Sequence, residues 1–353
     1  MSSLNPENYM SLALQLAELG RLTVSPNPMV GCIIVKDNQI IGQGYHQRAG
    51  EAHAEILALQ QAGQNAQNAT VYINLEPCCH YGRTPPCVNA LIAAGIHKVY
   101  VACLDPNPLV AGKGVEALRS AGITVEVGLF ETKARTLNEI FFHYIQHKTP
   151  FVIAKWAMSL DGKTITAPTD SKKISSDESQ QHAHQIRMQA DAILIGANTA
   201  ILDDPLLTVR LTNNVCDQHP IRIILAGKNP LPNHLRLFDK NLPGKTVVAT
   251  SNLASTKMLP KHIEVLELPA KDQLISLPDL LKELGNKEIT SLLVEGGMKV
   301  LESFYKENLV NKTHVYIAPT IIGNLTKKMP LKVLDSFNLG RDYFIECIGE
   351  SHV

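Results

Sequence analysis

Hydrophobic residues in the first part of the chain recur with the periods of helices and strands in alternation. Apolar positions from Tyr9 to Leu19 fall at helical spacing, and Asn5-Pro6 before them is typical of a helix N-terminus. β-Branched runs on both sides of Asp37-Asn38 predict two strands joined by a tight turn. The pattern then predicts a helix over 53–62, a strand over 69–77, a helix over 87–96 and a strand over 98–106. The range 114–130 predicts a helix, a break at Gly122 and a further strand. This order is that of an α/β domain.

The segment 131–148 predicts a single helix with one apolar face, which Pro150 ends. A strand over 151–164 then begins a new pattern, so we place a domain boundary near Thr149, with domains at 1–149 and 150–353. The pattern in the second half predicts helices over 175–190, 277–285 and 300–308, and strands over 192–197, 221–227, 246–250, 263–268, 291–297 and 314–319. The second half is therefore also α/β, but no G-x-G-x-x-G follows its first strand. The tail after Pro330 is assigned no element.

Composition narrows the class of protein. A chain of 353 residues fits two domains, and 33 basic against 33 acidic residues create no field that attracts polyanions, so nucleic acid is not expected as a partner. No stretch is long and apolar enough to span a membrane, and the N-terminus does not have the pattern of a signal peptide. Seven cysteines, some better used on metal than in disulfides, indicate a reducing compartment. We expect a cytoplasmic protein.

A histidine and two cysteines have the pattern of a catalytic zinc site. His53, Cys78 and Cys87 offer one imidazole and two thiolates, which leaves a fourth position open for water. Glu55, two residues after His53, is placed to move protons, as in the H-x-E and Pro-Cys segments of zinc deaminases. Cys79 and His80 are the alternative ligands, and buried thiols are the structural alternative for the cysteines.

Particular motifs extend this pattern to a family. The long Cys-to-Cys segment HYGRTPPC, with SPNPMVG at 25–31 and GYHQRAGEAHAE at 44–55, resembles the deaminase half of bifunctional riboflavin-biosynthesis proteins. KWAMSLDGKT, LIGANTAILDDPLLTVR and LVEGG resemble the dihydrofolate-reductase-like reductase of the same proteins. The resemblance implies an N-terminal cytidine-deaminase-like three-layer α/β/α domain followed by a dihydrofolate-reductase-like α/β domain. It also implies zinc and NADPH as cofactors, and a homo-oligomer, either a dimer or a tetramer.

The reaction implied by the resemblance has two steps. The first is hydrolytic deamination of 2,5-diamino-6-(5-phosphoribosylamino)pyrimidin-4(3H)-one. The second is NADPH-dependent reduction of the ribosyl chain, which gives 5-amino-6-(5-phosphoribitylamino)uracil. Two alternatives are a cytidine or adenosine deaminase acting on nucleic acid and a non-catalytic zinc-stabilised binding module. Balanced charge and the absence of a basic stretch interleaved with aromatics argue against the first, and Glu55 beside a three-ligand site argues against the second.

The resemblance also assigns site residues by position. For substrate in the deaminase half these are Asn27 and His46. His80 and Arg83, in the Pro-rich segment between the two cysteines, either meet the substrate phosphate or belong to a solvated loop tip. For substrate in the reductase half these are Ser171, Arg187, Leu207, Arg210 and Glu295. For NADPH these are Ala157, Lys173, Thr199, Asp203, Gly297, Met298, Lys299, Val300, Leu301, Glu302 and Ser303.

The chemistry of some of these residues supports a role, and each also has a plain structural reading. Asn27 lies between two prolines, where an amide either binds a heterocycle or closes an Asx-type turn. Arg187 and Arg210 suit a phosphate group, or are surface arginines.

We expect Lys155 and Glu295 to form the catalytic cation and acid of the reductase, with a solvated lysine at a strand edge as the alternative. His182 and His184 lie two apart on a helix, so we expect them to be solvated and not to form a metal pair.

Overall fold

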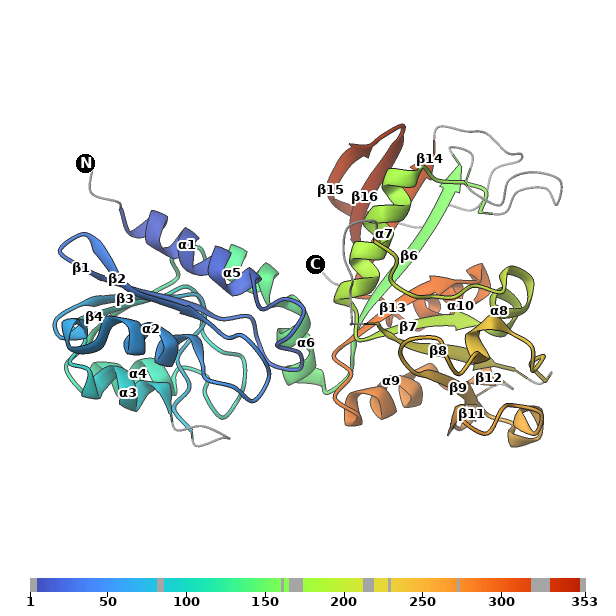
Figure 1. Cartoon of the computed structure of the whole chain (residues 1–353), viewed down its shortest axis with the longest axis horizontal. Coiled ribbons are helices and arrows are strands. Elements are labelled where there is room, and N and C mark those ends of the chain that lie inside the picture. The colour runs from blue at the N-terminus through green and yellow to red at the C-terminus, as the bar shows by residue number, and fades with distance from the viewer. Residues whose placement is uncertain are drawn as a thin grey trace. The chain divides into compact units, whose positions relative to one another are not determined.

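The computed structural model describes residues 5–80, 86–159, 162–164, 174–211, 219–227, 230–271, 274–318 and 331–349. The chain divides into two compact units, residues 1–148 and 149–353 (Figure 1). No helix within the described residues has both the length and the apolarity needed to cross a bilayer.

The first unit is built on a five-stranded sheet with the order β2-β1-β3-β4-β5. Its strands are β1 Gly31–Lys36, β2 Gln39–Tyr45, β3 Thr70–Ile73, β4 Lys98–Val101 and β5 Thr124–Val127. β1 runs antiparallel to β2 and β3, whereas β3, β4 and β5 are parallel. Asp37 and Asn38 join β1 to β2 with φ angles of 50° and 60°, the left-handed pair that a primed hairpin turn requires.

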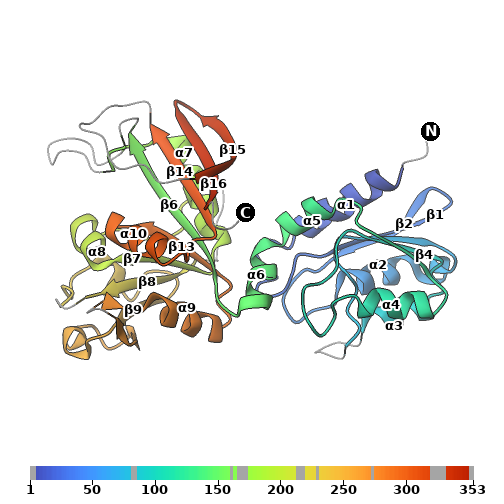
Figure 2. The ribbon, with the colours of Figure 1, turned by 180° about the vertical axis from the view of Figure 1, so that it is seen from behind.

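Helices cover both faces of this sheet, as the views from the two sides show (Figures 1 and 2). Because side chains alternate along a strand, Ile34 packs with one helical layer and Ile33 with the other. One layer holds α2 Ala54–Ala62, α3 Cys87–Ala93 and α4 Lys113–Ser120, and the other holds α1 Pro6–Glu18, α5 Glu131–Leu137 and α6 Glu139–His147. The expected three-layer α/β/α arrangement is confirmed.

The prediction of one helix over 131–148 is wrong, because the chain breaks at Asn138 into α5 and α6. The buried Asn138 side chain accepts a hydrogen bond from the Met29 N–H at 2.8 Å and donates one to the Met29 carbonyl at 2.9 Å. At Asn138 the helix is therefore interrupted, and the side-chain amide is hydrogen-bonded to the loop before β1. Helical periodicity of apolar residues carries no signal for such a break.

The second unit is built on a nine-stranded sheet with the order β10-β9-β8-β7-β13-β6-β14-β16-β15. Its strands are β6 Phe151–Ser159, β7 Ala192–Gly196, β8 Ile221–Ala226, β9 Thr246–Thr250, β10 Glu264–Glu267, β13 Ser291–Gly296, β14 Lys312–Ala318, β15 Leu331–Leu339 and β16 Asp342–Gly349. The strands from β10 to β14 are parallel, and β16 and β15 add an antiparallel edge. The strands β11 Ala270–Lys271 and β12 Leu274–Ile275 form a separate pair.

Four helices accompany this sheet: α7 Asp177–Gln189, α8 Ala197–Asp203, α9 Leu277–Asn286 and α10 Met298–Lys306. Buried leucines of α9, together with Leu301 and Phe304 of α10, pack on strand residues such as Val152 and Val294 and form the core under one face. The short α8 was not expected, since its apolar Ile201 and Leu202 are exposed and give no amphipathic pattern. Apart from α8, the division into α5 and α6, the strands β15 and β16, and five elements of one turn or less, the predicted order of helices and strands is the observed one.

The residues after Pro330, for which no element was predicted, form the β15–β16 hairpin, which is hydrogen-bonded to the N-terminal end of α7. Asp342, the first residue of β16, accepts hydrogen bonds from the Ser179 hydroxyl at 2.9 Å and from the Ser176 N–H. Ser176 is the N-cap of α7. The C-terminal hairpin therefore helps to place the helix that carries Arg187.

Candidate active sites

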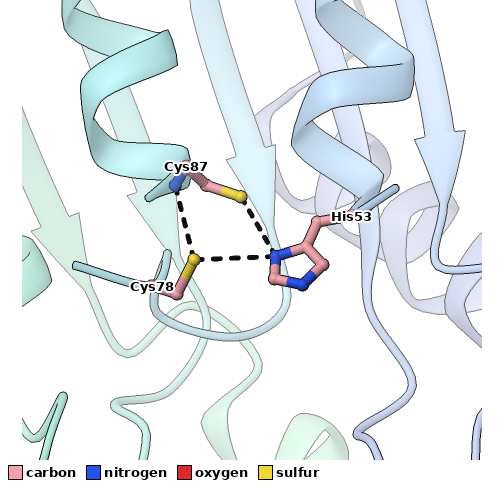
Figure 3. A group of neighbouring side chains, drawn as sticks. All are labelled: His53, Cys78 and Cys87. Atoms are coloured by element: carbon pink, nitrogen blue, oxygen red, sulfur yellow. Dashed lines mark hydrogen bonds between the residues drawn. The ribbon is translucent and has the colours of Figure 1, made fainter. Parts of the chain in front are cut away.

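The predicted zinc ligands lie together in the first unit (Figure 3). His53 Nδ1 is 3.2 Å from Cys87 Sγ and 3.6 Å from Cys78 Sγ, and the three ligand atoms all lie within 4.8 Å of one another. A tetrahedral zinc with ordinary Zn–S and Zn–N lengths separates its donor atoms by roughly 3.5–3.8 Å. The donor set and its spacing therefore fit zinc.

Local structure brings these ligands together and favours ionised sulfur. His53 immediately precedes α2, Cys87 is the first residue of α3, and Cys78 lies in the segment after β3. The Cys87 N–H donates to Cys78 Sγ at 3.3 Å. Contact with Cys87 lowers the pKa of the Cys78 thiol to about 4, and the same contact raises the pKa of the Cys87 thiol well above its usual value. The negative charge of the pair is therefore placed on Cys78, and a thiolate is the form that binds a metal.

Glu55 lies in the first turn of α2 and is buried, with 3% of its surface exposed. Burial raises the pKa of its carboxyl to about 6, against the attraction of the His53 imidazole. A carboxyl with a pKa near neutrality can both accept and release a proton, as a proton-transfer group must.

Asn27 and His46 form a hydrogen-bonded pair near His53, the predicted zinc ligand. Asn27 Nδ2 lies 3.1 Å from His46 Nε2, and His46 Nδ1 lies 3.2 Å from the Ala52 carbonyl. The rings of His46 and His53 are 5.5 Å apart between centroids. Since the buried His46 uses both ring nitrogens, it orients the Asn27 amide, whose oxygen is then directed away from His46.

The remaining predicted residues of the first unit are distributed as follows. Cys79, an alternative ligand, points its Sγ toward the Leu109 carbonyl at 3.7 Å and is not part of the ligand cluster. His80 has a buried Nδ1 that meets no hydrogen-bond partner in the described part of the chain. Arg83, like Ser171 and Lys173 of the second unit, lies outside the described residues.

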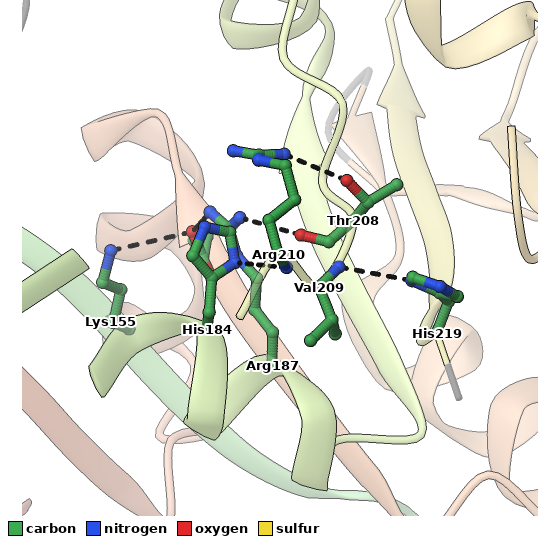
Figure 4. Close-up of polar contacts among 8 residues, drawn as sticks. Lys155, His184, Arg187, Thr208, Val209, Arg210 and His219 are labelled. Carbon is green, nitrogen blue, oxygen red and sulfur yellow. Dashed lines mark hydrogen bonds and ion pairs between the residues drawn. The ribbon is translucent and has the colours of Figure 1, made fainter. Parts of the chain in front are cut away.

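Glu295 is the centre of a charged cluster in the second unit, and Figure 4 labels its partners Lys155 and Arg187. Arg187 Nε and Nη2 donate to its two carboxylate oxygens at 2.6 and 2.7 Å, and Lys155 Nζ lies 3.7 Å from Oε2. Burial raises the pKa of Glu295, but the charges of Arg187 and Lys155 outweigh it and bring that pKa to about 2. Glu295 is therefore a permanent anion between two cations.

Lys155 is not a strand-edge residue. It lies on β6, which has β13 on one side and β14 on the other, and its side chain is 16% exposed. Burial lowers the pKa of its ammonium, and Glu295 opposes that shift. The ammonium also lies 5.3 Å from the centre of the Tyr316 ring, a cation–π contact that the sequence did not suggest.

The two arginines predicted to bind substrate in the second unit, Arg187 and Arg210, have different partners. Arg187 commits two guanidinium nitrogens to Glu295, and its Nη1 lies 3.5 Å from the Thr208 carbonyl. Arg210 is an exposed residue whose Nη1 donates to Thr208 Oγ1 at 3.0 Å. Arg210 is accordingly the arginine more open to an anionic ligand, next to the buried Leu207.

Thr199, one of the residues predicted to bind NADPH, lies against a glycine turn before α10. Gly297 has a φ of 69°, and a Cβ there would lie 3.1 Å from Thr199 Oγ1; one at Gly296 would lie 3.2 Å from Thr199 Cγ2. This close approach, at the start of a helix, fits a backbone cradle for a pyrophosphate. Asp203 ends α8, on which Thr199 also lies, and Ala157 lies on β6.

Residues 297–303 form this turn and the first part of α10, namely Gly297, Met298, Lys299, Val300, Leu301, Glu302 and Ser303. Leu301 is 1% exposed and packs in the core, so its side chain faces away from any cofactor. Ser303 Oγ donates to the Lys299 carbonyl at 2.8 Å within the helix.

The expectation that His182 and His184 are solvated is wrong. His184 is buried and its Nδ1 accepts from the Arg210 N–H, while His182 Nδ1 lies 2.9 Å from the Tyr316 hydroxyl. The two histidines face different groups, as their spacing indicated. Their helix has low average hydrophobicity, and the contacts come from residues distant in sequence.

The fold and the two clusters define a zinc-binding deaminase unit followed by a dihydrofolate-reductase-like reductase unit. Residues 4–103 match the cytidine and deoxycytidylate deaminase zinc-binding region, and residues 150–338 match the RibD C-terminal domain. The chain belongs to the RibD family of riboflavin biosynthesis proteins.

Similar proteins cover almost the whole chain. Riboflavin biosynthesis protein RibD of Aquifex aeolicus is 46% identical over 90% of this chain and 88% of its own, and that of Escherichia coli is 41% identical over 90% and 89%. A structure of Acinetobacter baumannii RibD superposes with a TM-score of 0.86 at 37% identity, covering 97% of this chain and 98% of that one. The Thermotoga maritima diaminohydroxyphosphoribosylaminopyrimidine deaminase/5-amino-6-(5-phosphoribosylamino)uracil reductase does so with 0.86 at 34% identity and the same coverage.

These comparisons confirm the resemblance and both expected folds. The protein is a bifunctional riboflavin biosynthesis enzyme that combines a deaminase with a reductase, and its cofactors are zinc and NADPH. Neither a nucleic-acid deaminase nor a non-catalytic binding module accounts for a match that extends over both units.

Proposed function

We propose that residues 1–149 deaminate 2,5-diamino-6-(5-phosphoribosylamino)pyrimidin-4(3H)-one at its 2-amino group. We further propose that residues 150–353 reduce the product to 5-amino-6-(5-phosphoribitylamino)uracil. The observation that carries this proposal is the presence of two separate catalytic clusters on one chain, His53–Cys78–Cys87 with Glu55 and Lys155–Glu295–Arg187. The Thermotoga maritima protein, of which this chain covers 98%, carries a name that joins these two activities.

The proposal is tested with the purified protein, zinc, NADPH and the diaminopyrimidine substrate, by following ammonia and NADPH oxidation in separate assays. We expect ammonia without NADPH, and NADPH oxidation with the deaminated compound alone. Wild-type protein that releases no ammonia, or that oxidises no NADPH with the deaminated compound, would contradict the corresponding half.

In the deaminase unit, Glu55 is the group that moves protons. Zinc, when held by His53, Cys78 and Cys87, lowers the pKa of water and so makes it a nucleophile at neutral pH. Glu55 takes a proton from the attacking water and delivers it to the adjacent ring nitrogen, and it then carries the remaining hydroxyl proton to the amino group. The C–N bond breaks, ammonia leaves, and the carbon becomes a carbonyl beside a ring N–H. Asn27, oriented by His46, would hydrogen-bond the pyrimidine, and His80 and Arg83 would face its phosphate.

In the reductase unit, Lys155 is the proton donor and Glu295 keeps it charged. NADPH supplies a hydride, which in the ring-opened imine form of the sugar adds to the carbon of the C=N bond. Lys155 donates a proton to the nitrogen, and hydride and proton together balance the reduction. Glu295 attracts the ammonium at 3.7 Å and, with Ser171 and Leu207, would position the sugar chain.

The cofactor's position follows from the glycine turn. We assign the pyrophosphate of NADPH to residues 297–303 at the start of α10, with Thr199, Asp203, Ala157 and Lys173 as its other contacts. Thr199 is supported by its approach to Gly297.

The ligand assignment predicts the effect of single cysteine substitutions on metal content. Cys79→Ser should retain about one zinc per chain, because its sulfur points to Leu109, whereas Cys78→Ser should lose most of it. Metal analysis of both purified variants after the same dialysis measures this. Zinc lost from Cys79→Ser and kept by Cys78→Ser would mean that the ligand is misassigned.

The assignment of Arg210 to the substrate phosphate predicts a selective loss. A charge-assisted hydrogen bond is worth roughly 1.5–3 kcal/mol, so Arg210→Ala should lower reductase kcat/KM by about ten-fold to a hundred-fold. With Arg210→Ala, the reductase kcat/KM for dephosphorylated substrate should be almost the same as for phosphorylated substrate. The deaminase rate should not change. Equal discrimination against the dephosphorylated compound by wild type and variant would remove Arg210 from the phosphate site.

We also propose a cytoplasmic enzyme that forms a homo-oligomer, a dimer or a tetramer. Cys32, Cys78, Cys79, Cys87 and Cys103 form no disulfide, which suits a reducing compartment. Light scattering on the eluted protein would determine the oligomeric state.

A further inference from the structure

The segment that carries Arg210 is held on its backbone by two histidines (Figure 4). The Arg210 N–H donates to His184 Nδ1 at 3.4 Å, and the N–H of the preceding residue, Val209, donates to His219 Nδ1 at 3.3 Å. His184 comes from α7 and His219 precedes β8, so two separate parts of the unit hold two successive peptide groups. Neither histidine has a role in the reaction as proposed above.

Leu207 and Thr208, which precede Val209 and Arg210, also have defined conformations and contacts. Thr208 is buried and accepts twice, from Arg210 Nη1 at its hydroxyl and from Arg187 Nη1 at its carbonyl, 3.5 Å away. Leu207 before it has a φ of 52°, a left-handed conformation that a leucine adopts only when its surroundings impose it. The backbone from Leu207 to Arg210 is therefore set by contacts from outside the segment.

His184 is suited to be a permanent acceptor. It is buried, with Arg187 and Lys155 of the Glu295 cluster and Arg210 itself as its charged neighbours. Burial and the charge of Arg187 lower its pKa to about 4, so the imidazole is neutral at neutral pH and one nitrogen carries no proton. The hydrogen bond from Arg210 identifies that nitrogen as Nδ1.

Helical spacing links this acceptor to the catalytic cluster. His184 and Arg187 are three residues apart on α7, so their side chains leave the same face of the helix. One contacts the backbone of Arg210 and the other holds Glu295. The same helix therefore sets the position of the proposed phosphate ligand relative to Glu295 and Lys155.

We propose that His184 is a positioning residue for the substrate phosphate: its Nδ1, together with that of His219, fixes the peptide groups of Val209 and Arg210 so that the Arg210 guanidinium meets the phosphate. This inference rests on the proposed role of Arg210. The histidine acts on substrate binding through Arg210 and takes no part in hydride or proton transfer.

Two amide substitutions of the same histidine provide the test. Asparagine places its carbonyl oxygen near the position of Nδ1, whereas glutamine places it near that of Nε2, so only His184→Asn retains the acceptor for Arg210. We expect His184→Gln to raise the reductase KM for the phosphorylated substrate by about three-fold to ten-fold, the range of one neutral hydrogen bond, with kcat within about two-fold of wild type. His184→Asn should stay within about two-fold of wild type in both constants.

Two further measurements separate positioning from general damage. Gln185→Leu, an exposed site on the same helix, should leave both constants unchanged. In an Arg210→Ala background, His184→Gln should add less than about two-fold, because the residue through which it acts is absent. The affinity of the phosphorylated product without NADPH, measured by calorimetry, should fall with His184→Gln by the same factor as KM rises.

The outcomes distinguish this inference from the proposed function. If wild type does not prefer phosphorylated over dephosphorylated substrate, the assignment of Arg210 to the phosphate is wrong, and the role of His184, which depends on it, is also wrong. If wild type does prefer it, and His184→Asn and His184→Gln behave alike or His184→Gln is as harmful without Arg210 as with it, only the role of His184 is overturned.

Discussion

Replacing Glu55 with glutamine should lower the rate of ammonia release by about 10²-fold to 10⁴-fold, the range typical of an acid–base group. Glutamine has nearly the same size but cannot carry a proton from water to the leaving amine. His53, Cys78 and Cys87 remain, so zinc content should stay at the wild-type value. Ammonia release under saturating substrate and metal analysis of the same sample measure both quantities.

Glu51→Gln is the matched control for this change. Glu51 is exposed, lies in the same segment and is paired with Arg48 at 3.8 Å on the surface, so its replacement should leave ammonia release unchanged. NADPH oxidation by Glu55→Gln on the deaminated compound should also equal that of wild type. Deamination by Glu55→Gln at the wild-type rate would show that another group moves the proton, and a parallel loss of reduction would show that the two activities are coupled.

The zinc cluster could be predicted from the sequence because its parts lie at the ends of regular elements. His53 precedes a helix with clear spacing, Cys87 begins another, and Cys78 follows a strand that pairs in the middle of the sheet. Chemistry limits the choice further, since few combinations of residue types supply three zinc ligands and a neighbouring carboxylate. Element type and ligand chemistry were sufficient there.

The reductase cluster shows where such reasoning stops. Lys155 and Glu295 are distant in sequence and meet because β6 and β13 are neighbours in the sheet, which no local pattern specifies. Resemblance supplied Glu295, and the structure adds that Arg187 is bound to it. His184 was misread as solvated because its partner, the Arg210 N–H, is distant in sequence and leaves no local pattern.

Hydrogen bonds between side chains and groups distant in sequence were not predicted either, because no local pattern specifies them. Asn138 breaks a helix whose apolar face looks continuous, because it binds Met29 far back in the chain. Asp342 fastens a tail hairpin to α7 through Ser176 and Ser179. A polar residue within a periodic segment carries no local sign of such a partner, so the fold class could be predicted while these positions could not.

Replacing Lys155 with methionine should lower reductase kcat by about 10²-fold to 10⁴-fold under saturating NADPH, because the proton for the imine nitrogen then has no donor. The variant should still fold: methionine matches the length of the buried side chain, and Glu295 keeps both hydrogen bonds from Arg187, so no anion is left unpaired. Ammonia release by the same protein should be unchanged. Single-turnover NADPH oxidation on the deaminated compound measures the loss.

The pH dependence adds a second test of the same role, since a proton donor must be protonated to act. Burial lowers the pKa of Lys155, so the wild-type reductase rate should fall with rising pH at a value below the usual lysine range, and Lys155→Met should lack that limb. Lys282→Met, an exposed lysine on α9, is the control and should keep both the rate and the profile of wild type. If Lys155→Met turned over near the wild-type rate, or kept the alkaline limb, proton donation would have to be assigned to another group facing the imine, and the Lys155–Glu295 pair would be left with a role in holding the sugar chain.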